Sequence, residues 1–278
     1  MRIGTRGSAL ALAQARWVAE RLGGENEVVV IESSSAPADD KSRWVSALEQ
    51  ALLENRIDVA VHSAKDVPVE LPDGLALVAI PEREDPRDAI CGASSLAELA
   101  SGARIGTSSL RRAAQIRALR EDVEVVALRG NVDTRLRKLG DGECDALVLA
   151  LAGLRRLGRE DEVGGVLDEL VPAAGQGALA LEARPGLPGV DVLNDARSAA
   201  CNAAERELVA TLGASCNTAV GAFARMLEDG QLELTGWVGA VDGSRWISDR
   251  LVGASGEGLG TALAERMLAV GAGELLVA

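Results

Sequence analysis

The stretch "ARIGTSSLRRAAQIRALREDVEVVALRGNVDTRLRKLGDGECDALVLA" (residues 103–150) indicates an α/β fold, because short apolar runs alternate with amphipathic ones along it. The apolar runs are typical of strands and cover residues 103–109, 123–128 and 144–150. The amphipathic runs between them, residues 110–120 and 131–140, are typical of helices. This strand–helix–strand rhythm predicts a parallel sheet with helices on its faces.

The same rhythm opens the chain. Three strands are expected at residues 1–6, 27–33 and 57–63, with helices at residues 8–24 and 42–56. Ser8 is the expected N-cap of the first helix, and Gly23 lies near its end. The proline- and charge-rich segment "IPEREDPRDAI" (residues 80–90) then interrupts the pattern and predicts a crossover into a second domain.

The last part of the chain has a different texture. A long helical pattern covers residues 190–212, an alternating pattern typical of an antiparallel meander follows, and one helix closes the chain. We therefore predict two α/β domains and a small α+β domain. Domain 1 comprises residues 1–84 and 174–193, domain 2 residues 85–173, and domain 3 residues 194–278.

Composition excludes several classes of function. The formal net charge is −13, aromatic residues make up 2%, and tyrosine is absent. A nucleic-acid binder that relies on a basic surface and base stacking is therefore not expected, and neither is a membrane protein. The four cysteines show no CxxC spacing and His62 is the only histidine, so no metal site is expected. A reduced, cytoplasmic protein is the prediction.

Basic residues gather in one part of this acidic chain. Residues 104–138 hold nine basic and four acidic side chains, a net +5. Ligands of open α/β sheets bind at the carboxyl ends of the strands, where helix N-termini favour anions. A small polyanion is the predicted ligand of the arginines and hydroxyls at such turns: Arg6, Ser8, Thr107, Ser108, Ser109, Arg111, Arg112, Arg129 and Arg135. Solvated helix faces paired with acids are expected for Arg117, Arg120, Arg137 and Lys138.

Two further stretches carry candidate chemistry. "DVAVHSAKDVP" (residues 58–68) places Lys65 and Asp66 just after a strand, where they could transfer protons, hold a cationic group, or belong to an ordinary polar loop. "TLGASCNTAVG" (residues 211–221) displays Cys216 among small and polar residues. That cysteine could be a nucleophile, a metal ligand, an attachment point or a filler. Cys91, Cys144 and Cys201 are expected to be packing residues.

Several blocks occur in an order that resembles the hydroxymethylbilane synthase (porphobilinogen deaminase) family. They are "RGSALALAQA", "ALLENRIDVAVHSAKDVP", "EREDPRDA", "GTSSLRR", "LRGNVDTRL", "LALAGLRRLG" and "PAAGQGALALEAR". The resemblance is dense over residues 1–221. It implies two domains arranged like a type II periplasmic binding protein around a cleft, a third domain with a cysteine loop, and a monomer.

The resemblance also implies an activity. A dipyrromethane cofactor would be thioether-linked to Cys216. Four porphobilinogen molecules would be joined to it head to tail with loss of ammonia, and water would release the linear tetrapyrrole hydroxymethylbilane. Asp66 takes the catalytic position, where a carboxylate bonds the pyrrole N–H and stabilises the cationic azafulvene. A non-catalytic binding protein for a small polyanion is the alternative.

Matching the motifs residue by residue assigns the remaining roles. Cofactor binding would fall to Lys65, Asp66, Ser109, Arg111 and Arg112, and substrate binding to Arg6, Ser8, Arg129, Arg135 and Arg156, with no metal. Two stretches depart from the family pattern. The cysteine loop reads "GASCNTAVG", without the usual glycines before and proline after the cysteine, and the lid is shortened to "SSAPADDKSRWV". Residues 34–43 are therefore expected to close the cleft less completely.

Overall fold

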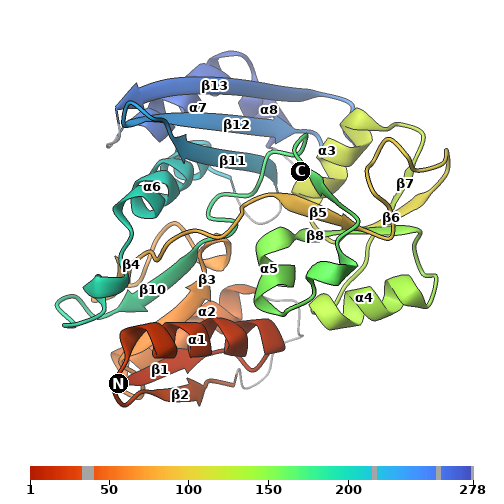
Figure 1. Ribbon diagram of the computed structural model, residues 1–278. Helices are drawn as coiled ribbons and strands as arrows, with labels where there is room; N and C mark the ends of the chain where they lie inside the picture. Colours follow the sequence, from red (N-terminus) through yellow and green to blue (C-terminus); the bar gives the residue numbers. More distant parts are fainter. Residues whose placement is uncertain (33–40, 215–217, 255–257, 277–278) are drawn as a thin grey trace. The chain divides into compact units, whose positions relative to one another are not determined.

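The computed structural model describes residues 1–32, 41–214, 218–254 and 258–276, apart from the side chains of residues 41–44 (Figure 1). Cys216 and residues 34–40 of the expected lid lie outside the described residues. The chain forms two compact units, Met1–Glu84 with Gly177–Ala199, and Asp85–Gln176 with Ala200–Ala278. The finer division into three domains stays a prediction.

The first unit is built on a five-stranded sheet in the order β2-β1-β3-β10-β4. β1 runs parallel to both β2 and β3, and β10 lies antiparallel between β3 and β4. The strands are β1 (Arg2–Thr5), β2 (Glu27–Val30), β3 (Val59–Ser63), β4 (Ala76–Ala79) and β10 (Leu179–Ala183).

Two helices cover opposite faces of this sheet. α1 (Ala9–Leu22) packs on the face that carries Val59 and Val61, and α2 (Lys41–Leu53) packs on the face that carries Ala60. The alternation follows from the pleat, which turns successive strand residues to opposite sides. Ser8 caps α1 and Gly23 follows its last turn, as predicted.

The second unit repeats this strand order in the sheet β7-β6-β8-β5-β9. Its strands are β5 (Asp88–Cys91), β6 (Arg104–Gly106), β7 (Glu124–Val126), β8 (Ala146–Ala150) and β9 (Gly165–Leu167). β6 is parallel to β7 and β8, whereas β5 is antiparallel to β8 and β9. The predicted parallel sheet is thus mixed in both units, because β5 and β10 enter from crossover segments rather than through a βαβ helix.

The helices of this second sheet also take opposite faces. Ile116 of α3 (Leu110–Leu119) packs with Ile90 and Val148. α4 (Val132–Gly140) and α5 (Leu151–Arg156) pack on the other face, together with the side chains of Ala89, Cys91, Leu147 and Leu149. α3 therefore covers the face of β5 and β8 that carries the even-numbered residues.

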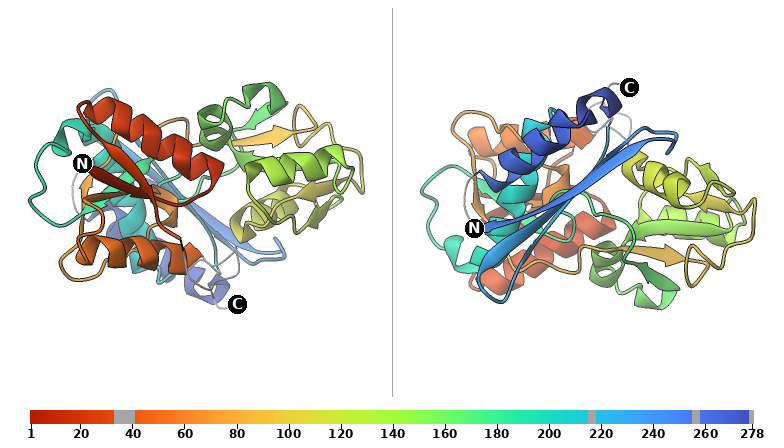
Figure 2. Two further views of the ribbon diagram at one scale, coloured as in Figure 1. Left: turned by 90° about the horizontal axis from the view of Figure 1, so that it is seen from below. Right: turned by 90° about the horizontal axis from the view of Figure 1, so that it is seen from above.

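The rest of the second unit is an antiparallel meander, as predicted, with helices packed on it (Figures 1 and 2). Its core unites apolar side chains of the sheet with Leu208, Leu263 and Met267. The elements are α6 (Ala196–Thr211), β11 (Ala219–Met226), β12 (Gln231–Gly239), β13 (Trp246–Ala254), α7 (Leu259–Ala269) and α8 (Ala272–Leu275). One closing helix was expected, but two are found in the described residues, because Gly271 adopts a left-handed conformation (φ 100°) between them.

One helix starts later than the sequence indicated. A helical pattern was expected from residue 190, but a 3-10 turn η3 (Asp191–Leu193) comes first and α6 begins at Ala196. The Asp195 carboxylate accepts a hydrogen bond from the Ser198 N–H at 2.7 Å, which satisfies a donor of the first turn. This cap fixes the start of α6.

Candidate functional site

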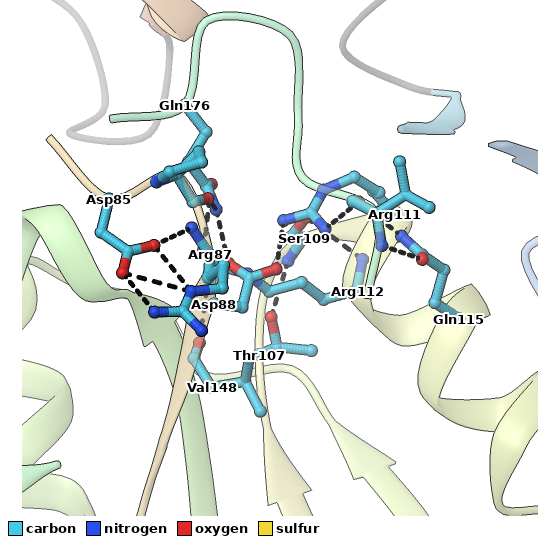
Figure 3. Close-up of polar contacts among 12 residues, drawn as sticks. Asp85, Arg87, Asp88, Thr107, Ser109, Arg111, Arg112, Gln115, Val148 and Gln176 are labelled. Atoms are coloured by element: carbon cyan, nitrogen blue, oxygen red, sulfur yellow. Dashed lines mark hydrogen bonds and ion pairs between the residues drawn. The ribbon is translucent and has the colours of Figure 1, made fainter. Parts of the chain in front are cut away.

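A buried carboxylate joins two buried arginines in the second unit (Figure 3). Asp88 opens strand β5 and is 0% exposed, and Arg111 and Arg112 on α3 are each 5% exposed. Arg111 Nη2 lies 2.7 Å from Asp88 Oδ2, and Arg112 Nη2 lies 2.7 Å from Asp88 Oδ1. Arg112 Nε donates to the same Oδ1 at 3.0 Å. Asp88 therefore ties α3 to β5 through two guanidinium groups.

The local sequence "GTSSLRR" places both arginines. β6 ends at Gly106, and Ser109 caps the N-terminus of α3 by accepting from the Arg112 N–H. The Ser109 N–H donates to Thr107 Oγ1 at 3.2 Å. A capped helix that starts directly after a strand presents its first-turn side chains at the carboxyl end of the sheet.

Gln176, which comes from a segment far along the chain, also bonds to Asp88 and Arg112 (Figure 3). Its Nε2 donates to Asp88 Oδ1 at 2.8 Å and to the Pro86 carbonyl at 2.7 Å. Arg112 donates to Gln176 Oε1 at 3.4 Å and to the Val148 carbonyl at 3.1 Å. Arg112, Gln176 and Val148 are buried, so the hydrogen bonds fix the orientation of Arg112 in a water-poor environment.

The charges in this network do not cancel. Burial opposes ionisation of Asp88, but the attraction of Arg111 and Arg112 outweighs it and holds the pKa of Asp88 well below its usual range. One carboxylate thus faces two guanidinium groups. The buried Nε of Arg111 has no hydrogen-bond partner among the described residues. A spare positive charge with an unused donor is suited to binding an anion.

The segment leading into β5 is itself held by ion pairs. Arg87 Nη2 lies 2.6 Å from Asp85 Oδ2, and Arg87 Nη1 lies 2.8 Å from Asp168 Oδ1. Hydrogen bonds from Arg87 hold the pKa of Asp85 below its usual range. These ion pairs hold the segment "EREDPRDA" in place and fix the point at which β5 begins with Asp88.

Further predicted anion ligands follow neighbouring strands of this sheet. β7, β6 and β8 are parallel, so their carboxyl ends lie at one edge. Arg129 follows β7 and is exposed, and Arg156 ends α5 after β8 and is half-buried. Arg135 on α4 donates to Ser108 Oγ at 3.0 Å, which joins the turn after β6 to that helix.

The four bases expected on solvated faces behave differently from this group. Ion pairs join Arg137 to Asp141 and Lys138 to Glu143, as predicted. Arg120 also pairs with Asp122, but its side chain is only 19% exposed and donates to the Leu96 and Leu99 carbonyls, so it does not lie on a solvated face. Arg117 instead donates to the Val241 carbonyl at 2.7 Å.

The first unit presents the other predicted residues at the ends of β1 and β3, which are parallel neighbours. Arg6 and Ser8 follow β1, and Ser8 Oγ accepts from the Ala11 N–H at 3.3 Å. Lys65 and Asp66 lie half-buried on the 3-10 turn η1 (Ala64–Asp66) that follows β3. The sheet therefore gathers these four residues at one edge.

The turn that carries Asp66 is fastened on two sides. Gln14 of α1, which is 3% exposed, donates to Ser63 Oγ at 2.9 Å. On the other side the Ala64 N–H donates to the Ala178 carbonyl at 3.0 Å. These bonds fix the start of η1 relative to α1 and β10.

A buried cluster of ionisable groups lies in the same sheet. His62 on β3 has its Nε2 2.9 Å from Glu182 Oε2 on β10, an ion-pair distance without hydrogen-bond alignment. Their side chains are 3% and 0% exposed. Glu49 on α2 is 7% exposed, and burial and the nearby Glu182 charge raise its pKa, against the attraction of His62. Glu49 thus resists ionisation in the folded protein.

The remaining cysteines match their predicted role. Cys91, Cys144 and Cys201 are buried, and burial raises the pKa of the Cys91 thiol to about 11. Within the described ranges, no group of His, Cys, Asp and Glu side chains could hold a metal ion. None of the helices that the structure describes is long and apolar enough to cross a bilayer.

The sequence motifs predicted no role for four residues that the structure places in these networks: Asp88, Gln176, Glu182 and Gln14. All four lie inside quoted motifs. The available signal was a polar residue within an otherwise apolar or small-residue run, such as the aspartate of "DAIC" and the glutamate of "LALEA". A charged residue on a buried strand requires a partner, and the arginines of "LRR" supply one.

Comparison with known families decides the identity of this arrangement. Residues 1–189 match the family model "Porphobilinogen deaminase, dipyromethane cofactor binding domain", and residues 199–269 match "Porphobilinogen deaminase, C-terminal domain". The chain belongs to the porphobilinogen deaminase family. Cys216 falls in the range of the C-terminal family model, and the arginine pair and Asp66 fall in the cofactor-binding one.

Curated relatives agree over nearly the whole chain. The porphobilinogen deaminase of Deinococcus radiodurans is 46% identical over 99% of this chain and 97% of its own length. That of Brevibacillus brevis is 40% identical over 99% and 96%. Among solved structures, a nutrient-binding protein from Burkholderia cenocepacia bound to methionine is 12% identical with a TM-score of 0.43, over 69% of this chain and 89% of its own. A periplasmic substrate-binding protein from Coxiella burnetii is 15% identical with a TM-score of 0.41, over the same shares.

The Asp88 network predicts a large loss of stability on neutralising its carboxylate. Asp88→Asn leaves two buried guanidinium groups with no counter-charge, so the free energy of unfolding should fall by about 3–5 kcal/mol at pH 7 in urea titrations. The depressed pKa means that the ionic contribution is present above the ordinary aspartate pKa and is lost as the pH falls below it. The difference in unfolding free energy between wild type and Asp88→Asn should therefore become smaller below about pH 4.

The matched control is Asp145→Asn, which breaks a surface pair with Arg104 in the same sheet. That change should leave the free energy of unfolding close to that of wild type, because solvent screens an exposed pair. Equal losses for the two variants would contradict the assigned importance of Asp88.

The Glu49 cluster predicts a pH dependence of opposite sign. Because the pKa of Glu49 is raised in the folded protein, its contribution to the free energy of unfolding is largest below the ordinary glutamate pKa. That contribution is lost as the pH rises through the pKa of the folded state. Glu49→Gln should match wild type near pH 4 and become more stable than wild type at pH 8, as measured by urea unfolding. Glu54→Gln is the control, since hydrogen bonds from Arg56 and Gln50 lower the pKa of Glu54. That variant should be less stable than wild type at pH 8, and the same ordering for Glu49→Gln would refute the assignment.

Proposed function

We propose that this protein joins four porphobilinogen molecules head to tail, with loss of ammonia, on a dipyrromethane held by Cys216, and releases hydroxymethylbilane. The observation that supports this most is the arginine pair on Asp88, with its spare charge and unused Nε donor. It lies in a domain whose family is described by its dipyrromethane cofactor.

The residues fit that cofactor. A dipyrromethane made from porphobilinogen carries acetate and propionate carboxylates, and these are the anions that guanidinium groups bind best. Arg111, Arg112 and Ser109 would hold them at the start of α3, and Lys65 would bind a further carboxylate. The buried Arg111 Nε–H is a donor that such a carboxylate would satisfy.

The growing chain needs further anion ligands, because each added unit brings two more carboxylates. Arg129, Arg135 and Arg156 follow neighbouring strands of the second sheet, and Arg6 and Ser8 follow β1 of the first. These residues would bind the carboxylates of the incoming substrate and of the chain already made.

Asp66 would act on the reacting ring. Its carboxylate would accept a hydrogen bond from the pyrrole N–H and stabilise the positive charge that develops when ammonia leaves porphobilinogen. The same carboxylate can take up the proton that is lost when the new carbon–carbon bond forms. Its turn is fastened by the Ala64–Ala178 bond and the Gln14–Ser63 bond, so the carboxylate is held in place rather than recruited from a loose loop.

Cys216 would be the anchor of the cofactor, joined by a thioether that persists through turnover. When bound, the dipyrromethane supplies the terminal pyrrole carbon to which the first substrate unit is joined. The other three cysteines are buried, which leaves them unsuited to this task.

A non-catalytic polyanion binder is the weaker candidate, because family membership over nearly the whole chain favours the enzyme. A monomer in the cytoplasm completes the proposal. It is supported by the four cysteines without CxxC spacing and by the high net negative charge.

The intact mass of the protein tests the anchor. Protein made in cells that synthesise haem should exceed the polypeptide mass by one dipyrromethane, and Cys216→Ser should return the mass to that of the polypeptide. Cys144→Ala, which removes a buried thiol, should keep the added mass. An unmodified wild type would favour the binding protein, and added mass that persists in Cys216→Ser would place the attachment elsewhere.

Substitution of Asp66 tests the chemistry. Asp66→Asn keeps the shape of the side chain but removes the charge that stabilises the cationic intermediate, so turnover of porphobilinogen should fall by at least about 100-fold. The melting temperature and the cofactor mass should stay near those of the parent. Asp73→Asn, an exposed aspartate of the same unit, is the control and should retain full activity. Activity of Asp66→Asn within about threefold of wild type would remove Asp66 from its role.

A further inference from the structure

Residues Val171 and Pro172 form a bridge inside the second unit, defined here as the Val171–Pro172 bridge. On one side it is bonded to α3, and on the other to β11. Val171 is half-buried and Pro172 is buried. Neither residue carries a side chain that could take part in the reaction, so the bridge can act only through position.

Two side chains of α3 form hydrogen bonds with the bridge. Gln115, which is 2% exposed, accepts from the Val171 N–H at 2.7 Å and donates to the Val171 carbonyl at 3.0 Å. Arg111 Nη1 donates to the same carbonyl at 2.7 Å. Gln115 therefore satisfies both backbone groups of Val171, and the Val171 carbonyl in turn orients the Arg111 guanidinium.

On its other side, the bridge is in close contact with β11. The Ala222 N–H donates to the Pro172 carbonyl at 2.8 Å. A Cβ placed on Gly221 would lie 2.8 Å from the Val171 carbonyl oxygen and 3.0 Å from Val171 Cβ. The Val171 side chain packs with Ala114, Ala219 and Trp237, which come from α3, β11 and β12. No side chain larger than hydrogen fits at residue 221 without moving the bridge.

The bridge thus connects two parts of the proposed cofactor site. Arg111 belongs to the anion-binding pair, and β11 begins at Ala219, three residues along the chain from Cys216. We propose that the Val171–Pro172 bridge sets the position of Arg111 relative to the strand that follows the cofactor cysteine, with Gln115 as its positioning residue. This inference rests on the proposed function.

Two variants disturb the bridge from opposite sides. Gln115→Met keeps the length of the side chain but removes both bonds to Val171, and Gly221→Ala pushes the Val171 backbone from the β11 side. A misplacement of about 1 Å at an anchoring group can cost up to about 100-fold in rate. Both variants should lower kcat for porphobilinogen by about 10-fold or more while KM changes by less than about threefold. The fraction of purified protein that carries the cofactor mass should fall below that of wild type.

Each variant has a matched control. Arg117→Met removes the hydrogen bond from α3 to the Val241 carbonyl in the meander and leaves the bonds to the bridge in place. Gly140→Ala adds a methyl group where nothing lies within 4 Å. Both controls should keep wild-type kcat and full cofactor mass. The melting temperature of all four variants separates a loss of stability from a loss of position.

The outcomes are distinct. If Gln115→Met and Gly221→Ala both keep wild-type kcat and cofactor mass, or if Arg117→Met loses as much as Gln115→Met, the bridge has no positioning role. Should Gln115→Met fail to accumulate as folded protein, Gly221→Ala decides by the same two readouts. A wild type without added mass or turnover overturns the proposed function itself, whereas an active wild type with unaffected bridge variants overturns only this inference.

Discussion

The structure of the second unit depends on one interaction, the buried carboxylate of Asp88 between the guanidinium groups of Arg111 and Arg112. None of the three charges could be buried alone, because the desolvation of an isolated ion costs far more than the free energy of folding. Their mutual attraction makes burial possible. Gln176 adds a hydrogen bond to Asp88, the Val148 carbonyl accepts one from Arg112, and the Val171 carbonyl accepts one from Arg111. The excess positive charge that remains is suited to binding an anion.

The two sheets place chemistry in the same way. Each has three parallel strands followed by an antiparallel one in the same order, and each carries its polar residues at the carboxyl ends of the parallel strands. In the first sheet these ends carry Asp66 with its neighbouring lysine, and in the second they carry the arginines. Under the proposed function, the first sheet would carry the proton chemistry and the second would bind the carboxylates.

Much of this was predictable from local patterns. The alternation of strands and helices gave the α/β class, Ser8 and Gly23 marked the ends of the first helix, and the meander followed from period-two alternation. These features depend on neighbours in sequence. The direction of β5 and β10 depends instead on crossover segments, and the late start of α6 depends on the cap by Asp195.

The partners of the site residues were beyond sequence reasoning for the same physical reason. Asp88 meets Arg111 across 23 residues and Gln176 across 88, and His62 meets Glu182 on a strand from the far end of the unit. Only the tertiary fold brings these groups together. The arginines themselves were visible as a local excess of positive charge at strand ends, but the carboxylate that buries two of them was not.

In the proposed function, the arginine pair held by Asp88 binds a carboxylate of the dipyrromethane through the unused donor of Arg111. A crystal structure of the cofactor-loaded protein tests this contact. We expect it to show a cofactor carboxylate oxygen within about 3.2 Å of Arg111 Nε, with Asp88 still bonded to both guanidinium groups. Cofactor carboxylates bound by other residues, with Arg111 Nε facing only protein or solvent, would contradict it.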